Sequence, residues 1–201
     1  MSWLEHITRM ATLADLVARL DHRVAPAHRA EDAEGLRAAV AAIMRERSGR
    51  AEILFIKRAE RQSDPWSGHM AFPGGRREAS DETLLHTARR ETLEEVGLDL
   101  GTAARCVGRL PDVMPYARMP HALTVTAFLF AMESDAELTL NEEVAAVVWA
   151  PLEGVLRGDG ATQFRWQRDG VDLTLPALDI DGNVVWGLTY RMLELLREAI
   201  T

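Results

Sequence analysis

The chain has 201 residues, of which 47% are apolar, and this is enough to build one domain with a substantial core without disulfides or a structural metal. Its single cysteine, Cys106, excludes an intramolecular disulfide and a cysteine-rich zinc site, so we expect a reducing, cytoplasmic setting. The formal net charge of -8 is unfavourable for nonspecific binding to a nucleic acid polymer, whose phosphates require cationic neutralisation, but it is compatible with a small phosphorylated ligand held by a metal.

The N-terminal part of the chain predicts helices and no membrane segment. Residues 1–20 mix charged side chains with leucines and lack the unbroken apolar core of a signal peptide or a membrane span. The spacing of the apolar residues predicts helices near Thr12–Leu20 and over Glu31–Arg47. We therefore expect one domain over residues 1–201, with an N-terminal helical extension over about residues 1–50.

The rest of the chain alternates strand and helix signals. The β-branched and aromatic run Ala51–Ile56 predicts a buried strand that leads through a polar loop to the turn Phe72–Gly75. A helix then runs to Val96, with Ser80 or Asp81 as its N-terminal cap and Gly97 as its C-terminal stop. Further strands are predicted at Ala104–Leu110, Leu123–Met132, Val144–Trp149 and Gly170–Leu175, before a last helix near Gly187–Ala199.

One flank of the helix that ends at Val96 concentrates carboxylates. On a helical wheel Glu91, Glu94 and Glu95 lie together, beside a flank of apolar residues that can pack on a core. Like charges at these spacings destabilise an isolated helix by roughly a few tenths of a kcal/mol per pair, so a purely structural helix gains nothing from them. A divalent cation reverses that cost, because hard cations such as magnesium take oxygen ligands. For a glutamate-rich helix taken alone, a solvated acidic face remains the alternative interpretation.

The order of residues from Gly75 to Leu98 resembles the Nudix box. The pattern of that family begins with a glycine, which five residues separate from a glutamate. Seven further residues lead to the segment Arg-Glu-apolar-x-Glu-Glu-x-Gly-apolar. Here seven residues separate Glu82 from Arg90, as in that pattern. Six residues rather than five separate Gly75 from Glu82, and Thr92 replaces the usual aliphatic residue. The resemblance implies an α/β/α sandwich with a mixed β-sheet and a metal-dependent hydrolase that cleaves a pyrophosphate bond.

A second set of matches resembles the coenzyme A pyrophosphatase branch of the Nudix superfamily. That branch shares the extra residue before the glutamate. The matches outside the box are Arg58-Ala59, Gly68, Phe72–Gly75, Glu143–Leu152 and Val185–Thr189. Ser63 stands where the branch carries an arginine, and Arg61 is the nearest replacement. The resemblance implies coenzyme A or a derivative as substrate, cleaved to 3',5'-ADP and 4'-phosphopantetheine. ADP-ribose, a nucleotide sugar, a dinucleoside polyphosphate, or a nonhydrolysing role as a nucleotide sensor stay open as alternatives.

The resemblance also implies a metal site. Glu91 and Glu95 would be the principal ligands of Mg2+, for which Mn2+ could substitute. Glu94 would be a third ligand or would orient a catalytic water, and the backbone carbonyl of Gly74 would be a further ligand. Arg90 would pair with a helix carboxylate such as Glu94 and hold it in place.

Residues outside the box complete the expected site. Family members often supply one more carboxylate from a loop, as ligand or general base, and Glu143 is favoured over Glu142 for this role. Four arginines are candidates for contacts with the substrate, namely Arg58, Arg76, Arg77 and Arg118. An exposed, solubilising role is the alternative for each of them. The expected partner is a small phosphorylated nucleotide, with no nucleic acid polymer and no membrane, and the resemblance also suggests a homodimer.

Overall fold

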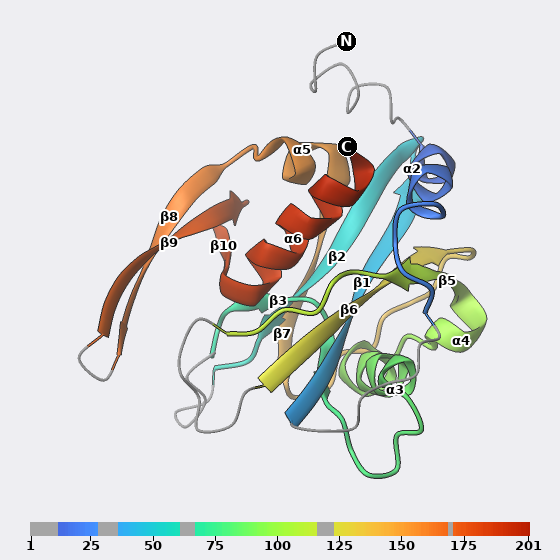
Figure 1. The fold of residues 1–201 in the computed structure, drawn as a ribbon, viewed down its shortest axis with the longest axis horizontal. Coiled ribbons are helices and arrows are strands. Elements are labelled where there is room, and N and C mark those ends of the chain that lie inside the picture. Colours follow the sequence, from blue (N-terminus) through green and yellow to red (C-terminus); the bar gives the residue numbers. More distant parts are fainter. Residues whose placement is uncertain (1–11, 28–35, 61–66, 116–122, 169–170) are drawn as a thin grey trace.

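The computed structural model describes residues 12–27, 36–60, 67–115, 123–168 and 171–201. A large mixed sheet lies between helices on its two faces, so the molecule has three layers (Figure 1). The helices are α2 (Leu13–Leu20), α3 (Leu84–Val96), α4 (Leu100–Ala103), α5 (Leu152–Arg157) and α6 (Gly187–Ile200). The strands are β1 (Leu36–Arg47), β2 (Arg50–Arg58), β3 (Met70–Ala71), β4 (Gly74–Arg76), β5 (Ala104–Arg109), β6 (Leu123–Met132), β7 (Val144–Pro151), β8 (Ala161–Arg168), β9 (Val171–Ile180) and β10 (Asn183–Trp186). The predicted α/β/α sandwich is confirmed.

Two cores hold the layers together. Buried side chains of α3 and α4 pack on one face of the large sheet, whereas those of α2, α5 and α6 pack on the other. The sheet runs in the order β3-β2-β1-β6-β5, and β7 pairs with β2. Because β1 and β6 are parallel and the other pairs are antiparallel, the sheet is mixed, as predicted.

The feature of the sheet that positions the candidate site is a split between β1 and β2. These strands pair only near their connecting turn, where Met44–Arg47 face Arg50–Ile53. The chain from β3 to β4 enters the gap beyond this point, with β3 pairing with β2 and β4 pairing with β1. Between them, the N–H of Ala41 donates to the carbonyl of Pro73 at 2.8 Å. The Phe72–Gly75 turn is therefore built into the sheet.

The helix predicted over Glu31–Arg47 is wrong in the part of that range that the structure describes, because Leu36–Arg47 forms strand β1. Its side chains alternate between the layers: Ala39 and Ala41 pack in the core under α3, whereas Ala38 packs in the core under α2 and α6. A strand buried on both faces is apolar throughout and shows no period of two. Since alanine also favours helices, the order of residues in this segment indicates a helix although the segment forms a strand.

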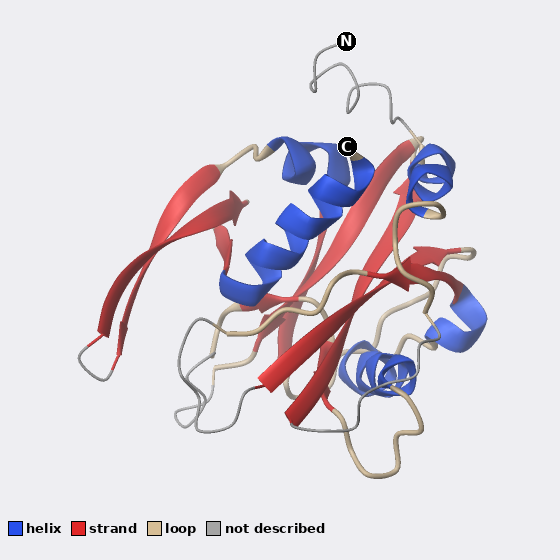
Figure 2. Cartoon of the chain, in the orientation of Figure 1, coloured by secondary structure: helices blue, strands red, loops and turns tan. Residues whose placement is uncertain are grey.

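The other predicted elements are present, the strand Leu123–Met132 with the predicted ends and the rest with ends shifted by a few residues. The last predicted strand, Gly170–Leu175, is longer than expected, because β9 continues to Ile180. It belongs to a second sheet, β10-β9-β8, which the sequence analysis only partly predicted, and the β8–β9 pair extends away from the body of the molecule (Figure 2). Within the described ranges, no helix is both long and apolar enough to cross a membrane. The organisation of residues 1–201 as one domain stays a prediction.

Candidate active site

Helix α3 is fixed at both ends by its own sequence. Thr83 is the N-terminal cap, and its hydroxyl accepts a hydrogen bond from the N–H of His86 at 3.1 Å. Gly97 ends the helix with φ of 70°, a left-handed conformation that glycine adopts without steric cost. The predicted stop is confirmed, whereas the predicted cap at Ser80 or Asp81 is wrong because the Asp81 carboxylate has other partners.

Asp81 anchors the loop that precedes α3. Its carboxylate accepts from Arg90 Nε at 2.9 Å and from Arg90 Nη2 at 3.0 Å, from the Thr87 hydroxyl at 3.0 Å and from the N–H of Glu78 at 2.9 Å. The hydrogen bond from the Arg90 guanidinium is the main reason that the pKa of Asp81 is lowered to about 2. This role of Asp81 could not be predicted from the sequence, because no periodicity places a loop residue against a helix nine positions later.

Arg90 links this anchor to the glutamates of α3. It donates to Glu94 Oε2 at 3.1 Å, as predicted, and also to Glu91 Oε1 at 3.0 Å. A further bond from Arg90 Nη2 reaches the backbone carbonyl of Arg76 at 3.1 Å, which ties the helix to strand β4. Arg90 therefore positions two carboxylates and the adjacent strand at once.

Glu95 is the most buried of the helix glutamates, with 3% of its surface exposed. Its Oε2 accepts a hydrogen bond from the N–H of Gly74 at 2.8 Å. The pKa of Glu95 is raised to about 7, mainly by burial and to a smaller extent by the negative charges of Glu91 and Glu143, whereas the Gly74 N–H and the charge of Arg58 oppose the rise. Burial also raises the pKa of Glu91. Glu91, Arg58 and Glu143 thus act electrostatically on one buried carboxyl group.

The two glycines of the turn allow the backbone to approach these carboxylates. Gly74 has φ of +148°, and a Cβ at this position would lie 2.3 Å from the carbonyl oxygen of Ala39. A Cβ at Gly75 would instead lie 2.5 Å from the carboxylate of Glu91. Gly74 therefore has no room for a side chain because strand β1 lies against it, and Gly75 has none because the Glu91 carboxylate lies against it.

This difference predicts two distinct outcomes for alanine substitution. Gly75→Ala should displace the flexible Glu91 carboxylate, so we expect turnover to fall by about 10- to 100-fold with a loss of stability below about 1 kcal/mol. Gly74→Ala should destabilise the fold by about 3 kcal/mol, because its Cβ meets backbone atoms in an unfavourable conformation. Urea unfolding and turnover of both variants test this, and equal destabilisation would contradict it.

A loop carries Glu143 to the same place. The N–H of Asn141 donates to the carbonyl of Glu95 at 3.1 Å, and the Asn141 side chain accepts from the N–H of Glu143 at 2.8 Å. The carbonyl of Glu143 in turn accepts from the N–H of Ala59 at 2.7 Å, directly after Arg58. These backbone contacts bring Glu143 and Arg58 beside the end of α3, and the role of Glu143 as the loop carboxylate stays a prediction.

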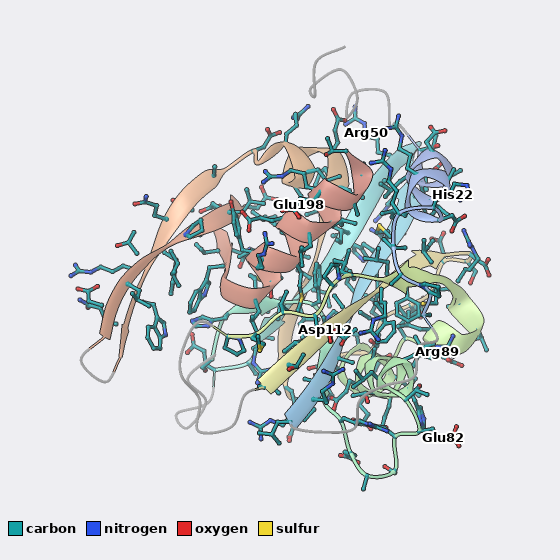
Figure 3. All side chains as sticks on the ribbon, viewed as in Figure 1. His22, Arg50, Glu82, Arg89, Asp112 and Glu198 are labelled. Carbon is teal, nitrogen blue, oxygen red and sulfur yellow. The ribbon has the colours of Figure 1, made fainter. Side chains whose placement is uncertain are left out.

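The remaining predicted site residues are placed less directly. Arg76 is exposed on β4, and Arg77 donates to the backbone carbonyls of Asp81 and Glu82, so it also braces the loop. Glu82 is exposed at the outer edge of that loop (Figure 3). The remaining candidate arginine, Arg118, lies outside the described residues.

The donor set of the site is suited to a hard divalent cation. Glu91 and Glu95 lie one helical turn apart, and burial removes part of the hydration of both carboxylates. Their negative charges also repel each other. A bound cation would offset both the lost hydration and the repulsion. Among the described side chains, no three His, Cys, Asp or Glu residues form a ready-made metal cluster, and Glu94 turns to Arg90. The fit therefore rests on two carboxylates and on backbone oxygens near Gly74.

The raised pKa of Glu95 predicts how the metal-free protein responds to pH. The folded state holds the proton up to about pH 7, whereas the unfolded chain releases it near its ordinary pKa of 4.5. Stability should therefore fall as the pH rises, by about 2 to 3 kcal/mol between about pH 5 and about pH 8. Urea unfolding in a chelator measures this change, and magnesium at the higher pH should restore stability. A flat profile would contradict the burial of a protonated Glu95.

Comparison with known proteins identifies the family of the chain. A family model described as the NUDIX domain matches residues 35–168. The mitochondrial coenzyme A diphosphatase NUDT8 of Mus musculus is 32% identical over 146 residues, which cover 71% of this chain and 68% of that protein. Its Homo sapiens counterpart is 30% identical over 141 residues, covering 68% of this chain and 58% of that protein. An uncharacterised protein of Schizosaccharomyces pombe is 39% identical over 118 residues, which cover 56% of this chain and 36% of that protein. The chain thus spans between about a third and two thirds of these relatives.

Solved structures agree on the fold. The NUDIX domain of Shewanella oneidensis NrtR, solved with ADP ribose, has a TM-score of 0.54 at 19% identity and covers 85% of this chain and 91% of that one. A NUDIX hydrolase from Alicyclobacillus acidocaldarius has a TM-score of 0.50 at 21% identity, and the match covers 62% of this chain and 82% of that one. The matched family model covers the glycine turn, α3 and the Glu143 loop together. The chain belongs to the Nudix family.

Proposed function

We propose that this protein is a divalent-cation-dependent pyrophosphohydrolase whose substrate is coenzyme A or one of its derivatives, with Mg2+ as the cation and Mn2+ as a substitute. The products would be 3',5'-ADP and 4'-phosphopantetheine. The observation that carries the proposal is the arrangement of Glu91 and the buried Glu95 against the Gly74-Gly75 backbone, with Arg90 held by Asp81. Nudix hydrolases generally use divalent metal ions, and this arrangement provides the oxygen donors for one.

Each residue of the site has a role in the proposed reaction. Glu91, Glu95 and the carbonyl of Gly74 would hold the cation, with Glu94 as a further ligand or an orienting group. The cation, when bound, neutralises pyrophosphate charge and makes water more acidic. Glu143 would accept a proton as the reaction proceeds, because it lies beside Glu95 in a loop tied to α3.

Arginines would orient the substrate. Arg58 is half-buried at the end of β2 and close enough to Glu95 to lower the pKa of that carboxyl group. A guanidinium there can engage phosphate oxygens in two directions, which favours one orientation of the pyrophosphate. Arg76 would contribute from the exposed end of β4. Arg77 and Arg118 remain candidates, and Arg77 would also keep its contacts with the loop.

The choice of coenzyme A is supported by two observations of different kinds. The glycine turn and the segments Arg58-Ala59 and Val185–Thr189 resemble the coenzyme A pyrophosphatase branch. Two relatives that match 68% and 71% of this chain are mitochondrial coenzyme A diphosphatases, at 30% and 32% identity. ADP-ribose is the second candidate substrate, because a structural neighbour binds it and Ser63 replaces the arginine of the branch.

A substrate panel tests the proposal. Purified protein would be incubated with magnesium at about pH 8 and with coenzyme A, ADP-ribose, a nucleotide sugar or a dinucleoside polyphosphate, and the products would be separated chromatographically. We expect coenzyme A to show the highest kcat/KM. A faster reaction with another pyrophosphate would overturn the substrate, and binding without turnover across the panel would favour a nucleotide sensor.

A further inference from the structure

A second charged cluster lies on the same face of the large sheet as α3. It consists of Arg37 on β1, Arg109 at the end of β5, Asp112 in the following loop and Thr126 on β6. Arg109 Nη2 donates to Asp112 Oδ1 at 2.9 Å, and the Thr126 hydroxyl donates to the same oxygen at 2.7 Å. Arg37 Nη1 lies 3.4 Å from Asp112 Oδ2. One carboxylate, labelled in Figure 3, thus serves two guanidinium groups.

The guanidinium groups of the two arginines are largely buried, and Asp112 does not accept hydrogen bonds from all of their nitrogens. The side chain of Arg109 is 6% exposed and that of Arg37 is 14% exposed. Within the described part of the chain, three buried side-chain nitrogens lack a hydrogen-bond partner, and two of them, Arg37 Nε and Arg109 Nη1, belong to this cluster. Among the described residues, the cluster therefore lacks a hydrogen-bond acceptor for Arg37 Nε and Arg109 Nη1.

The chemistry of that acceptor follows from the donors. Both Asp112 oxygens are already engaged, and the described members of the cluster carry two positive charges and one negative charge. A buried charged donor without a partner is strongly unfavourable, so an anion with several oxygens would stabilise the cluster. Guanidinium forks match the oxygen geometry of a phosphate group, which can accept from two arginines at once.

The cluster also lies near the carboxylate site. Arg37 is two residues before Ala39 on β1, so both side chains point to the α3 face and their Cα atoms are about 7 Å apart. Ala39 pairs with Gly75, whose Cα adjoins the Glu91 carboxylate, and with Thr126 on its other side. A ligand larger than a single phosphate could therefore reach from one site to the other.

We propose that Arg37 and Arg109, held by Asp112, form a binding site for a phosphate group that is separate from the Glu91–Glu95 site. Its occupant is a phosphate monoester of the substrate or free inorganic phosphate. Assignment to the substrate rests on the proposed function and would deepen it, because coenzyme A carries a 3'-phosphate in addition to its pyrophosphate.

Thermal unfolding of the metal-free protein tests the site without reference to activity. In a chelator, we expect inorganic phosphate to raise the Tm of the wild type by about 4 °C relative to chloride at equal ionic strength. Arg37→Gln should lose most of this shift, whereas Arg105→Gln, the same charge change on the exposed part of β5, should keep it. If Arg37→Gln does not fold, Arg37→Lys retains the charge and should still lose part of the shift. Absence of a shift in the wild type, or an equal shift in the Arg37 variants, would overturn the proposal.

A matched pair of substrates then identifies the source of the phosphate. Coenzyme A and dephospho-coenzyme A differ only in the 3'-phosphate. If the substrate supplies the group, Arg37→Gln should lower kcat/KM about 10- to 100-fold for coenzyme A and leave dephospho-coenzyme A nearly unchanged. Little effect on either compound would assign the site to free phosphate, whereas an equal loss with both would place Arg37 at the pyrophosphate that they share and would overturn a separate site. If neither compound is hydrolysed by the wild type, the proposed substrate fails while the thermal result still decides the site.

Discussion

Glu95→Gln is expected to lower turnover by about 10³-fold or more, because it removes an anionic cation ligand and with it several kcal/mol of charge stabilisation in the transition state. The same change should stabilise the metal-free protein at about pH 8 by about 2 to 3 kcal/mol, because a neutral amide has no buried charge to desolvate. The amide oxygen can still accept the hydrogen bond from the N–H of Gly74. Activity and stability should therefore change in opposite directions.

Glu137→Gln provides the matched control for this prediction. Glu137 is an exposed carboxylate in the loop between β6 and β7, so the same change of charge should leave turnover and stability nearly unaltered. Steady-state kinetics with magnesium and urea unfolding in a chelator supply both readouts. A Glu95 variant that is inactive because it is less stable would show that the residue is structural, and a variant with wild-type turnover would remove it from the proposed metal site.

Asp81→Asn should destabilise the fold about as strongly as Gly74→Ala. An amide cannot accept both hydrogen bonds from Arg90 and would turn a donor toward the guanidinium, so we expect a loss of about 3 kcal/mol. Release of Arg90 should also free Glu91 and Glu94, and a carboxylate that has lost its orienting partner typically binds metal about 10- to 100-fold more weakly. The magnesium concentration that gives half-maximal turnover should therefore rise, which a loss of folded protein alone would not cause.

The control for Asp81 is an aspartate–arginine pair on the surface. Asp159 accepts from Arg157 in an exposed pair, and Asp159→Asn should leave stability nearly unchanged, because solvent screens the interaction. Urea unfolding and a magnesium titration of turnover compare the two variants. Equal effects at the two positions, or an unchanged magnesium requirement in Asp81→Asn, would show that Asp81 does not position the site.

The sequence was most informative where chemistry and local structure depend on the same short segment. The helix that ends at Val96 and its stop at Gly97 could be predicted, because periodicity and a glycine cap are local signals. The pairing of Arg90 with Glu94 follows from the i,i+4 spacing of one helix. Glu143 could be selected only through the family resemblance, because its distance from α3 depends on how a loop folds back.

Residues that depend on tertiary contacts were missed or misread. Asp81 was considered as a helix cap, but it is buried by Arg90 and Thr87, which the order of residues does not bring together in any predictable way. Strand β1 was predicted as a helix because both of its faces are covered, which removes the alternation that identifies half-buried strands. The short strands β3 and β4 form only because β1 and β2 separate.

The backbone connection between α3 and the Glu143 loop bears on how this protein can change over evolution. The last carbonyls of a helix normally lack partners within it, and here those of Glu95 and Val96 accept from the N–H groups of Asn141 and Thr139. Main-chain atoms therefore set the spacing between the helix carboxylates and the loop carboxylate. Most side-chain replacements in this loop leave that spacing unaltered, whereas a gain or loss of one residue would alter it. We infer that the loop tolerates amino-acid substitutions far better than insertions or deletions.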